Sequence, residues 1–149
     1  MVLMSMYFDD ATMQDWAESI HKTQECVGEF MKLIGSPWAS AKSQPGANQG
    51  DFLGLVHDLN DVRSGTIRFW PREALVDKVT GIIRMARESG LHSGVAAKLY
   101  GICNFLETGM FARVGRAGLT AIKDRQYDHG TSLTPEISSS FDLLCDLFK

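Results

Sequence analysis

The sequence predicts an α+β protein in which two β-hairpins and a helix precede a helical bundle. Short apolar and β-branched runs, bounded by turn residues, indicate the hairpins. Apolar residues that recur with a period of about 3.6 indicate the helices. The helical pattern becomes continuous after Pro71. We therefore expect two parts, residues 1–70 and residues 71–149.

The first hairpin is expected at the start of the chain. Residues 2–8 are mostly apolar and predict a strand, Asp9-Asp10 a turn, and residues 11–13 a return strand. A two-residue hairpin turn usually contains Asn-Gly or Asp-Gly. Carboxylates beside a buried strand cost free energy unless they serve a turn, a cation or a basic partner. Asp9 and Asp10 are therefore either a solvated acidic turn or oxygen ligands for a divalent metal.

An amphipathic helix is expected over residues 15–34. Its apolar positions lie near a 3.6-residue period, at Trp16, Ile20, Val27, Phe30, Met31 and Ile34. Asp15 is the predicted N-cap with Glu18 as its capping-box partner, and Gly35 is the predicted stop.

The second hairpin follows a polar connector over residues 36–50. Residues 51–57 predict one strand and residues 66–70 the returning strand, with a turn between them. Further helices are expected from Pro71 to Gly90, after Ser93, over 116–127, and from Thr134 onward. The apolar residues expected to face inward in these helices are Leu75, Val79, Ile82, Ile83, Ala86, Val95, Leu99, Ile102, Phe105, Leu106, Met110, Ile137, Phe141 and Leu144, with Leu147 or Phe148.

Composition and charge restrict the function classes. The chain has 149 residues, 44% of them hydrophobic, and no apolar run of the length a bilayer requires. Residues 1–61 carry a net charge of −6 and residues 62–149 a net charge of +3. This split fits an acidic metal-binding part and a basic phosphate-binding part, or simply two solvated surfaces. The opening residues lack a basic segment, so we expect no signal peptide and a cytoplasmic or nuclear location.

The order of motifs resembles the C-terminal half of a reverse transcriptase palm followed by a thumb. Retrotransposon polymerases, including those of DIRS-like elements, have this arrangement. Tyr7-Phe8-Asp9-Asp10 matches the Tyr-x-Asp-Asp hairpin, and an amphipathic helix ending Leu33-Ile34-Gly35 follows it. Lys42 then lies in a loop, and Phe52-Leu53-Gly54-Leu55 matches the start of the primer-grip hairpin. Lys98-Leu99-Tyr100-Gly101 and Arg113-Val114-Gly115-Arg116 are similar to the thumb region.

The resemblance implies an RNA-directed DNA polymerase that uses Mg²⁺, deoxynucleoside triphosphates and a template–primer duplex. Asp9 would be a metal ligand, Asp10 a supporting acid and a second candidate ligand, and Lys42 a cation beside the departing pyrophosphate. The primer-grip residues would be Phe52, Leu53, Gly54 and Leu55. Residues that would contact the duplex are Arg113, Arg116, Lys123 and Arg125, with Arg84, Arg87 and Lys98 as further candidates. Each basic residue has the alternative of an ordinary solvated helix position.

The chain departs from the family in one respect that matters for activity. The family's site needs another aspartate, on a strand well upstream of the Tyr-x-Asp-Asp hairpin, together with a fingers region. We therefore expect a fragment with little or no polymerase activity and an exposed sheet edge. Two alternatives remain open. They are a non-catalytic nucleic-acid-binding module, and a structural protein that self-associates through an incomplete sheet edge.

Overall fold

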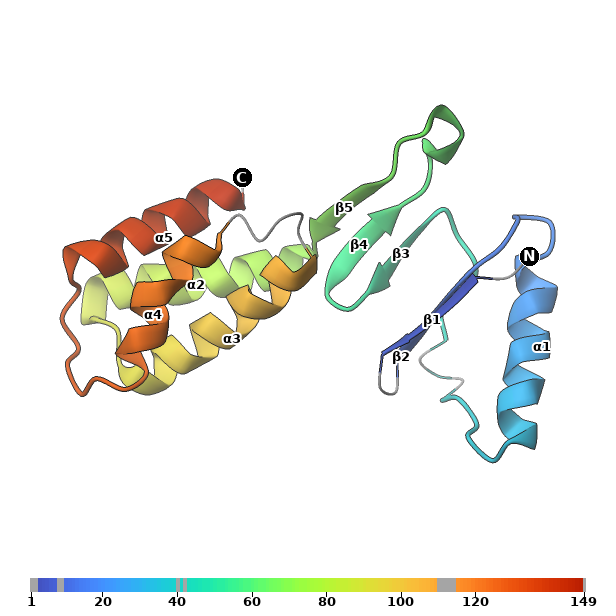
Figure 1. Cartoon of the computed structure of the whole chain (residues 1–149), viewed down its shortest axis with the longest axis horizontal. Coiled ribbons are helices and arrows are strands. Elements are labelled where there is room, and N and C mark those ends of the chain that lie inside the picture. Colours follow the sequence, from blue (N-terminus) through green and yellow to red (C-terminus); the bar gives the residue numbers. More distant parts are fainter. Residues whose placement is uncertain (1–2, 8–9, 40, 42, 110–114, 149) are drawn as a thin grey trace. The chain divides into compact units, whose positions relative to one another are not determined.

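Two strands, a helix and three further strands precede a run of helices, which is the order expected for this α+β chain (Figure 1). The computed structural model describes residues 3–7, 10–39, 41, 43–109 and 115–148. It divides into an N-terminal unit, residues 1–68, and a C-terminal unit, residues 69–149. The boundary falls near the one expected after residue 70. The assignment of the two parts to a palm and a thumb stays a prediction.

The first hairpin is formed by β1 (Leu3–Tyr7) and β2 (Asp10–Gln14), which pair antiparallel. Tyr7 lies opposite Asp10, and Ser5 opposite Thr12. Asp10 therefore belongs to the return strand, and the expectation that it lies in the turn is wrong. The connection consists of residues 8 and 9, which lie outside the described residues.

Helix α1 (Ile20–Leu33) begins five residues later than expected. Asp15 does not cap it, because its carboxylate Oδ2 accepts hydrogen bonds from Thr23 Oγ1 at 2.6 Å and Ser19 Oγ at 2.8 Å. These two bonds, the one from Thr23 first, hold the pKa of Asp15 below its usual value. The stop at Gly35 is confirmed: Gly35 has a φ of 79°, and its N–H donates to the Lys32 carbonyl. The Ser36 N–H donates to the Met31 carbonyl, which completes a Schellman motif.

The second hairpin differs from the expected one. Residues 51–57 contain two strands, β3 (Gln49–Phe52) and β4 (Leu55–Asp58), joined by a tight turn at Leu53-Gly54. The third strand, β5 (Arg68–Pro71), completes a sheet of order β3-β4-β5. A short 3₁₀ helix, η2 (Val62–Ser64), lies in the connection from β4 to β5. The turn was missed because a leucine occupies its first position, where hairpins usually carry Asn or Asp.

The N-terminal unit buries few of its apolar side chains. Among its described residues, the buried apolar side chains are those of Met31, Leu55 and Val56. Of the residues predicted to form the apolar face of the helix expected over residues 15–34, Trp16, Phe30 and Ile34 are 71%, 58% and 57% exposed. The expectation that this face points inward is therefore only partly met.

The C-terminal unit is a bundle of helices. It contains α2 (Glu73–Ser89), α3 (Ser93–Gly109), α4 (Thr120–Arg125) and α5 (Pro135–Leu147), with the 3₁₀ helix η4 (Arg116–Leu119) before α4. The last helix begins as expected, since Thr134 Oγ1 accepts a bond from the Ile137 N–H. Gly90 ends α2 with a φ of 84°, and a Cβ there would lie 2.4 Å from the Thr131 carbonyl oxygen.

These helices share one hydrophobic core. Its buried residues are Val79, Ile83, Ala86, Leu91, Ala96, Leu99, Cys103, Leu119, Ile122, Ile137, Phe141 and Leu144. Most positions expected to face inward do so, because the 3.6-residue period places them on one side of each helix. Phe105 and Val95 are exceptions, at 42% and 39% exposed. Met110 lies outside the described residues. Among the described helices, none is both long and apolar enough to cross a membrane.

Replacement of Phe141 tests the core of the C-terminal unit. The Phe141 side chain is fully buried, so Phe141→Ala removes packed volume and should cost about 3–5 kcal/mol of unfolding free energy. The matched control is Phe105→Ala, which should cost about 1 kcal/mol or less because the ring is partly in solvent. Urea denaturation followed by circular dichroism measures both. Equal losses for the two variants would contradict the described core.

Candidate functional site

The expected metal site lies at the end of the first hairpin. Asp9 and Lys42 fall outside the described residues. The backbone of Asp10 is placed at the start of β2, directly opposite Tyr7. The structure therefore places only the backbone of Asp10 among the residues of the expected metal site.

The expected primer-grip residues form the turn of the second hairpin. Phe52 lies opposite Leu55, and the two residues between them have positive φ angles, 49° at Leu53 and 76° at Gly54. Two successive left-handed residues define a type I′ turn. Leu53 is the one non-glycine residue with positive φ in the part of the chain that the structure describes. A branched side chain in this conformation costs about 1–2 kcal/mol.

Buried residues directly after the turn help to hold it. Leu55 and Val56 are 7% and 9% exposed, and the rings of Phe52 and His57 meet edge to face with centroids 6.1 Å apart. Because Leu55 and Val56 are consecutive in β4, they are buried on opposite faces of the hairpin, and this packing offsets the strain at Leu53. A strained, non-glycine turn held by its flanks is a feature found at functional sites.

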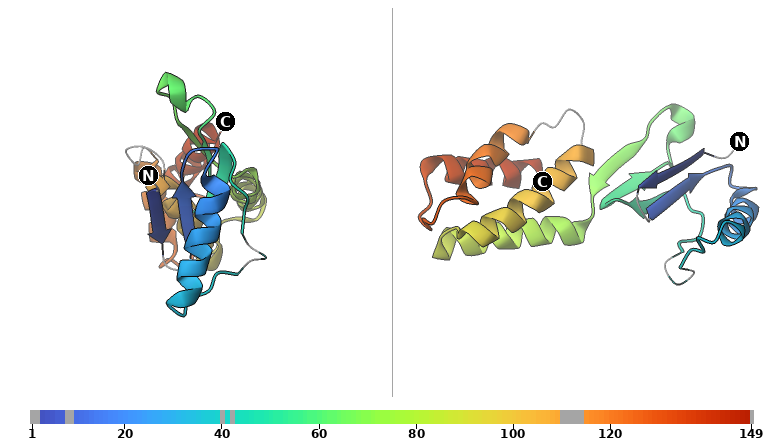
Figure 2. Two further views of the ribbon diagram at one scale, coloured as in Figure 1. Left: turned by 90° about the vertical axis from the view of Figure 1, so that its right-hand side faces the viewer. Right: turned by 60° about the horizontal axis from the view of Figure 1, so that its bottom comes forward.

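The two hairpins are neighbours within the N-terminal unit. Strand β2 contacts β3, although the two strands belong to separate sheets (Figure 2). The β1–β2 hairpin and the β3–β4 hairpin, which turns at Leu53-Gly54, are thus in contact. The sequence order alone did not establish this contact.

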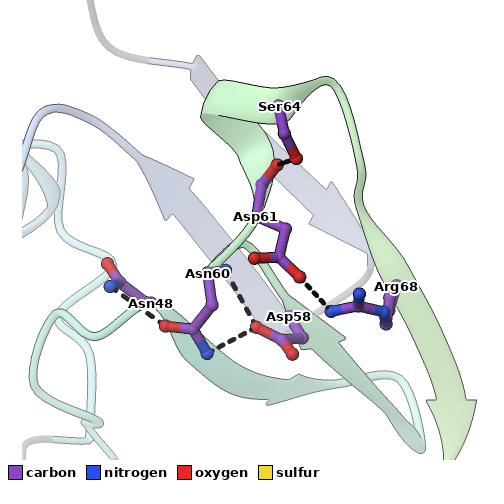
Figure 3. Close-up of polar contacts among 6 residues, drawn as sticks. All are labelled: Asn48, Asp58, Asn60, Asp61, Ser64 and Arg68. Atoms are coloured by element: carbon purple, nitrogen blue, oxygen red, sulfur yellow. Dashed lines mark hydrogen bonds and ion pairs between the residues drawn. The ribbon is translucent and has the colours of Figure 1, made fainter.

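A polar network follows β4 and was not expected as a site (Figure 3). Asp58 Oδ1 accepts bonds from the Asn60 N–H at 2.9 Å and from Asn60 Nδ2 at 2.7 Å. Asn60 Oδ1 in turn accepts from Asn48 Nδ2 at 3.2 Å, and Arg68 forms an ion pair with Asp61. These contacts are local and exposed, so they order the loop between β4 and β5. The Asp-x-Asn spacing is the signal that could have predicted this turn.

The basic residues of the C-terminal unit have different environments. Arg116 and Lys123 are exposed, whereas Arg113 lies outside the described residues. Arg125 is 4% exposed, and its guanidinium donates to Asp128 Oδ2 at 2.9 Å and to the Ser132 carbonyl at 2.6 Å. The expectation that Arg125 contacts nucleic acid does not agree with this burial. Its side chain instead holds the loop after α4.

The further basic candidates are on α2 and α3. Arg84 and Lys98 are exposed. Arg87 donates to Asp142 Oδ1 on α5 at 2.7 Å, and both side chains are largely solvated. Such an exposed ion pair contributes little to stability, so Arg87 could exchange its partner at small cost.

Potential metal ligands outside the first hairpin are not clustered in the described part of the chain. Among the described residues, no group of three or more His, Cys, Asp or Glu side chains is arranged to hold a metal ion. Cys103 is buried, and burial together with the nearby Glu107 raises its pKa to about 12. Cys26 is exposed and Cys145 half-buried. Cys103 therefore acts as a core residue.

Comparison with known proteins adds no relative. No protein-family model matches the chain, and neither a curated protein nor a solved structure is significantly similar to it. A functional interpretation therefore depends on the residues and the geometry described above.

Replacements in the turn test its strain. Leu53→Asn should stabilise the β3–β4 hairpin by about 0.5–1 kcal/mol, because asparagine adopts the left-handed conformation more easily. Gly54→Ala should destabilise it by about 1 kcal/mol, since alanine replaces glycine at a φ of 76°. Hydrogen exchange of the β3 and β4 amides measures both changes. A loss of protection in Leu53→Asn would contradict the turn described.

Proposed function

We propose that this chain is a portion of a reverse-transcriptase-type polymerase, containing the second half of the palm and a thumb-like bundle. The observation that carries the proposal is the contact between two hairpins. One bears Tyr7-Phe8-Asp9-Asp10 at its end, and the neighbouring one turns at Leu53-Gly54 within Phe52-Leu53-Gly54-Leu55. The reaction of the complete enzyme would be template-directed addition of deoxynucleotides to a primer.

The residues of the first hairpin suit metal binding. Asp9 and Asp10 supply the hard carboxylate oxygens that Mg²⁺ prefers. In phosphoryl transfer, a pair of such ions activates the attacking hydroxyl and stabilises the leaving group. In this proposal Asp9 is the ligand, Asp10 supports it, and Lys42 neutralises the pyrophosphate that departs.

The second hairpin suits contact with the primer end. Gly54 itself is buried, so the contact would be made by the partly exposed residues Phe52 and Leu53, which offer apolar surface at the turn. The strain at Leu53 supports a functional reason for keeping a leucine at a position that asparagine would fill at lower cost.

The proposed site is half of a two-metal centre. Two metals require more carboxylates than Asp9 and Asp10 supply, and the described residues offer no group of three that could complete the set. Activity would therefore need a further carboxylate-bearing segment. The chain alone is expected to bind metal weakly and to leave a primer unextended.

A paramagnetic ion tests the metal site directly. Mn²⁺ accepts the same oxygen ligands as Mg²⁺, so it should broaden the amide signals of Met6 and Ala11, which flank the hairpin end. The broadening should disappear in the double variant Asp9→Asn with Asp10→Asn. The matched control is Asp58→Asn with Asp61→Asn, which removes two carboxylates from the loop after β4 and should leave the broadening unchanged.

Two outcomes would count against the metal site. One is broadening centred on Asp58 and Asp61, and the other is broadening that survives the loss of Asp9 and Asp10.

In a primer-extension assay with Mg²⁺ and a labelled template–primer, the chain should give no product. Robust extension that disappears in Asp9→Ala would overturn the claim of inactivity and support the site.

A second candidate function is a non-catalytic nucleic-acid-binding module. The observation that favours it is the exposure of Arg116 on η4 and of Lys123 on α4. Contacts from such residues to phosphates are sequence-independent and weaken with salt. This function does not require Asp9 or Asp10.

Binding to a template–primer duplex separates the two candidates. Arg116→Ala with Lys123→Ala should weaken binding and reduce the slope of log affinity against log salt by about 2, or about 1 for each lost phosphate contact. Lys22→Ala with Lys32→Ala, on α1, is the matched control and should change neither value. Fluorescence anisotropy at several salt concentrations measures both. Preference for a recessed primer end over a blunt duplex would favour the polymerase, and its absence would favour the module.

A further inference from the structure

Helix α5 has a charge opposite to that of the rest of its unit. It carries three acidic residues, Glu136, Asp142 and Asp146, and no basic one. All three side chains are exposed. Residues 69–134, which precede α5 in the same unit, carry nine Lys or Arg against six Asp or Glu. Helix α5 therefore presents to the bundle the sign of charge that a phosphate backbone would present.

One residue of this helix binds a basic side chain of the bundle. Arg87 Nη2 of α2 donates to Asp142 Oδ1 of α5 at 2.7 Å, where the two helices lie side by side (Figure 1). The side chains of Arg87 and Asp142 are 49% and 68% exposed, so solutes can reach both. Carboxylate and phosphate oxygens accept hydrogen bonds from the same donors of an arginine. Asp142 and an arriving phosphate are therefore competitors for Arg87.

The exchange of partners requires rotation of side chains alone. Ile137, Phe141 and Leu144 of α5 are buried in the core of the bundle, so the helix itself stays in place. Asp142 lies at an exposed position of this fixed helix, and Arg87 has a long side chain with several rotatable bonds. Exposed ion pairs contribute little to stability. A phosphate can therefore displace Asp142 at a small cost, which lowers affinity without blocking binding.

We propose that Asp142 is an intramolecular competitor of nucleic-acid phosphates for Arg87, so that α5 limits the affinity of the bundle for nucleic acid. This inference rests on the second candidate function, that of a nucleic-acid-binding module. It assigns Arg87 as a phosphate-contacting residue and Asp142 as the group that the phosphate displaces. The effect is the same for every nucleic-acid sequence, because phosphate contacts carry no sequence information.

Binding of a labelled template–primer duplex, measured by fluorescence anisotropy, tests the competition. In low salt, Asp142→Asn should strengthen binding about twofold to fivefold, the range expected for one exposed ion pair. Arg87→Ala should weaken binding and reduce the slope of log affinity against log salt by about 1, because one phosphate contact is lost. Asp77→Asn is the matched control. It removes the same charge from an exposed position of α2 and should change affinity less than Asp142→Asn does.

The double variant separates the ion pair from the net charge. In the Arg87→Ala background, Asp142→Asn should have no more effect than Asp77→Asn, since no guanidinium remains to be released. A second measurement follows the displaced group itself. The side-chain carboxyl ¹³C signal of Asp142 should shift as duplex is added to the unaltered chain, whereas that of Asp77 should not.

The outcomes distinguish this inference from the function on which it rests. Binding that Arg116→Ala with Lys123→Ala weakens, but that Asp142→Asn strengthens no more than Asp77→Asn does, would overturn the inference alone. An equal gain from Asp142→Asn with and without Arg87 would overturn it as well. Absence of binding by both the unaltered chain and Asp142→Asn, each shown to be folded by circular dichroism, would overturn the nucleic-acid-binding function together with the inference.

Discussion

Burial of apolar side chains is distributed unequally between the two units, and much of the structure depends on this inequality. In the C-terminal unit, Phe141, Leu99 and Ile122 are fully buried in a core to which all four helices contribute. In the N-terminal unit, Leu55 and Val56 are buried beside Met31, while Phe30 and Leu33 remain exposed. Hydrophobic burial is the main favourable term in folding. The helical bundle therefore gains more free energy from its own core than the N-terminal unit gains from its three buried apolar side chains.

The small core of the N-terminal unit gives local backbone geometry more importance there. The turn at Leu53-Gly54 closes the β3–β4 hairpin, and the buried Leu55 and Val56 fix its register. Around this hairpin, the hydrogen bonds of Asp58 with Asn60 order the next loop. Strand β3 of this hairpin contacts β2, the strand that begins at Asp10. The residues proposed for the polymerase site therefore all belong to the unit with the smaller core.

The basic residues of the C-terminal unit have two different roles. Arg125 looks in sequence like the other basic residues of its region, but burial against Asp128 and the Ser132 carbonyl makes it part of the loop after α4. Arg116 and Lys123 remain in solvent, where their charges can act on a phosphate backbone. Arg125 has a structural role because it is buried and two of its guanidinium nitrogens donate hydrogen bonds within the protein.

The sequence by itself determined the α+β class, the order of hairpins and helices, the stop at Gly35 and the cap at Thr134, because these follow from periodicity and local backbone preference. It also determined most of the bundle core, including Val79 and Leu144. Tertiary structure alone decided that Leu53-Gly54 is a turn, since packing of the flanking residues overrides the unfavourable conformation of leucine. It likewise decided that Arg125 is buried, that Phe30 is exposed and that the two hairpins are neighbours. Such features depend on contacts between residues far apart in the chain, which local propensity does not encode.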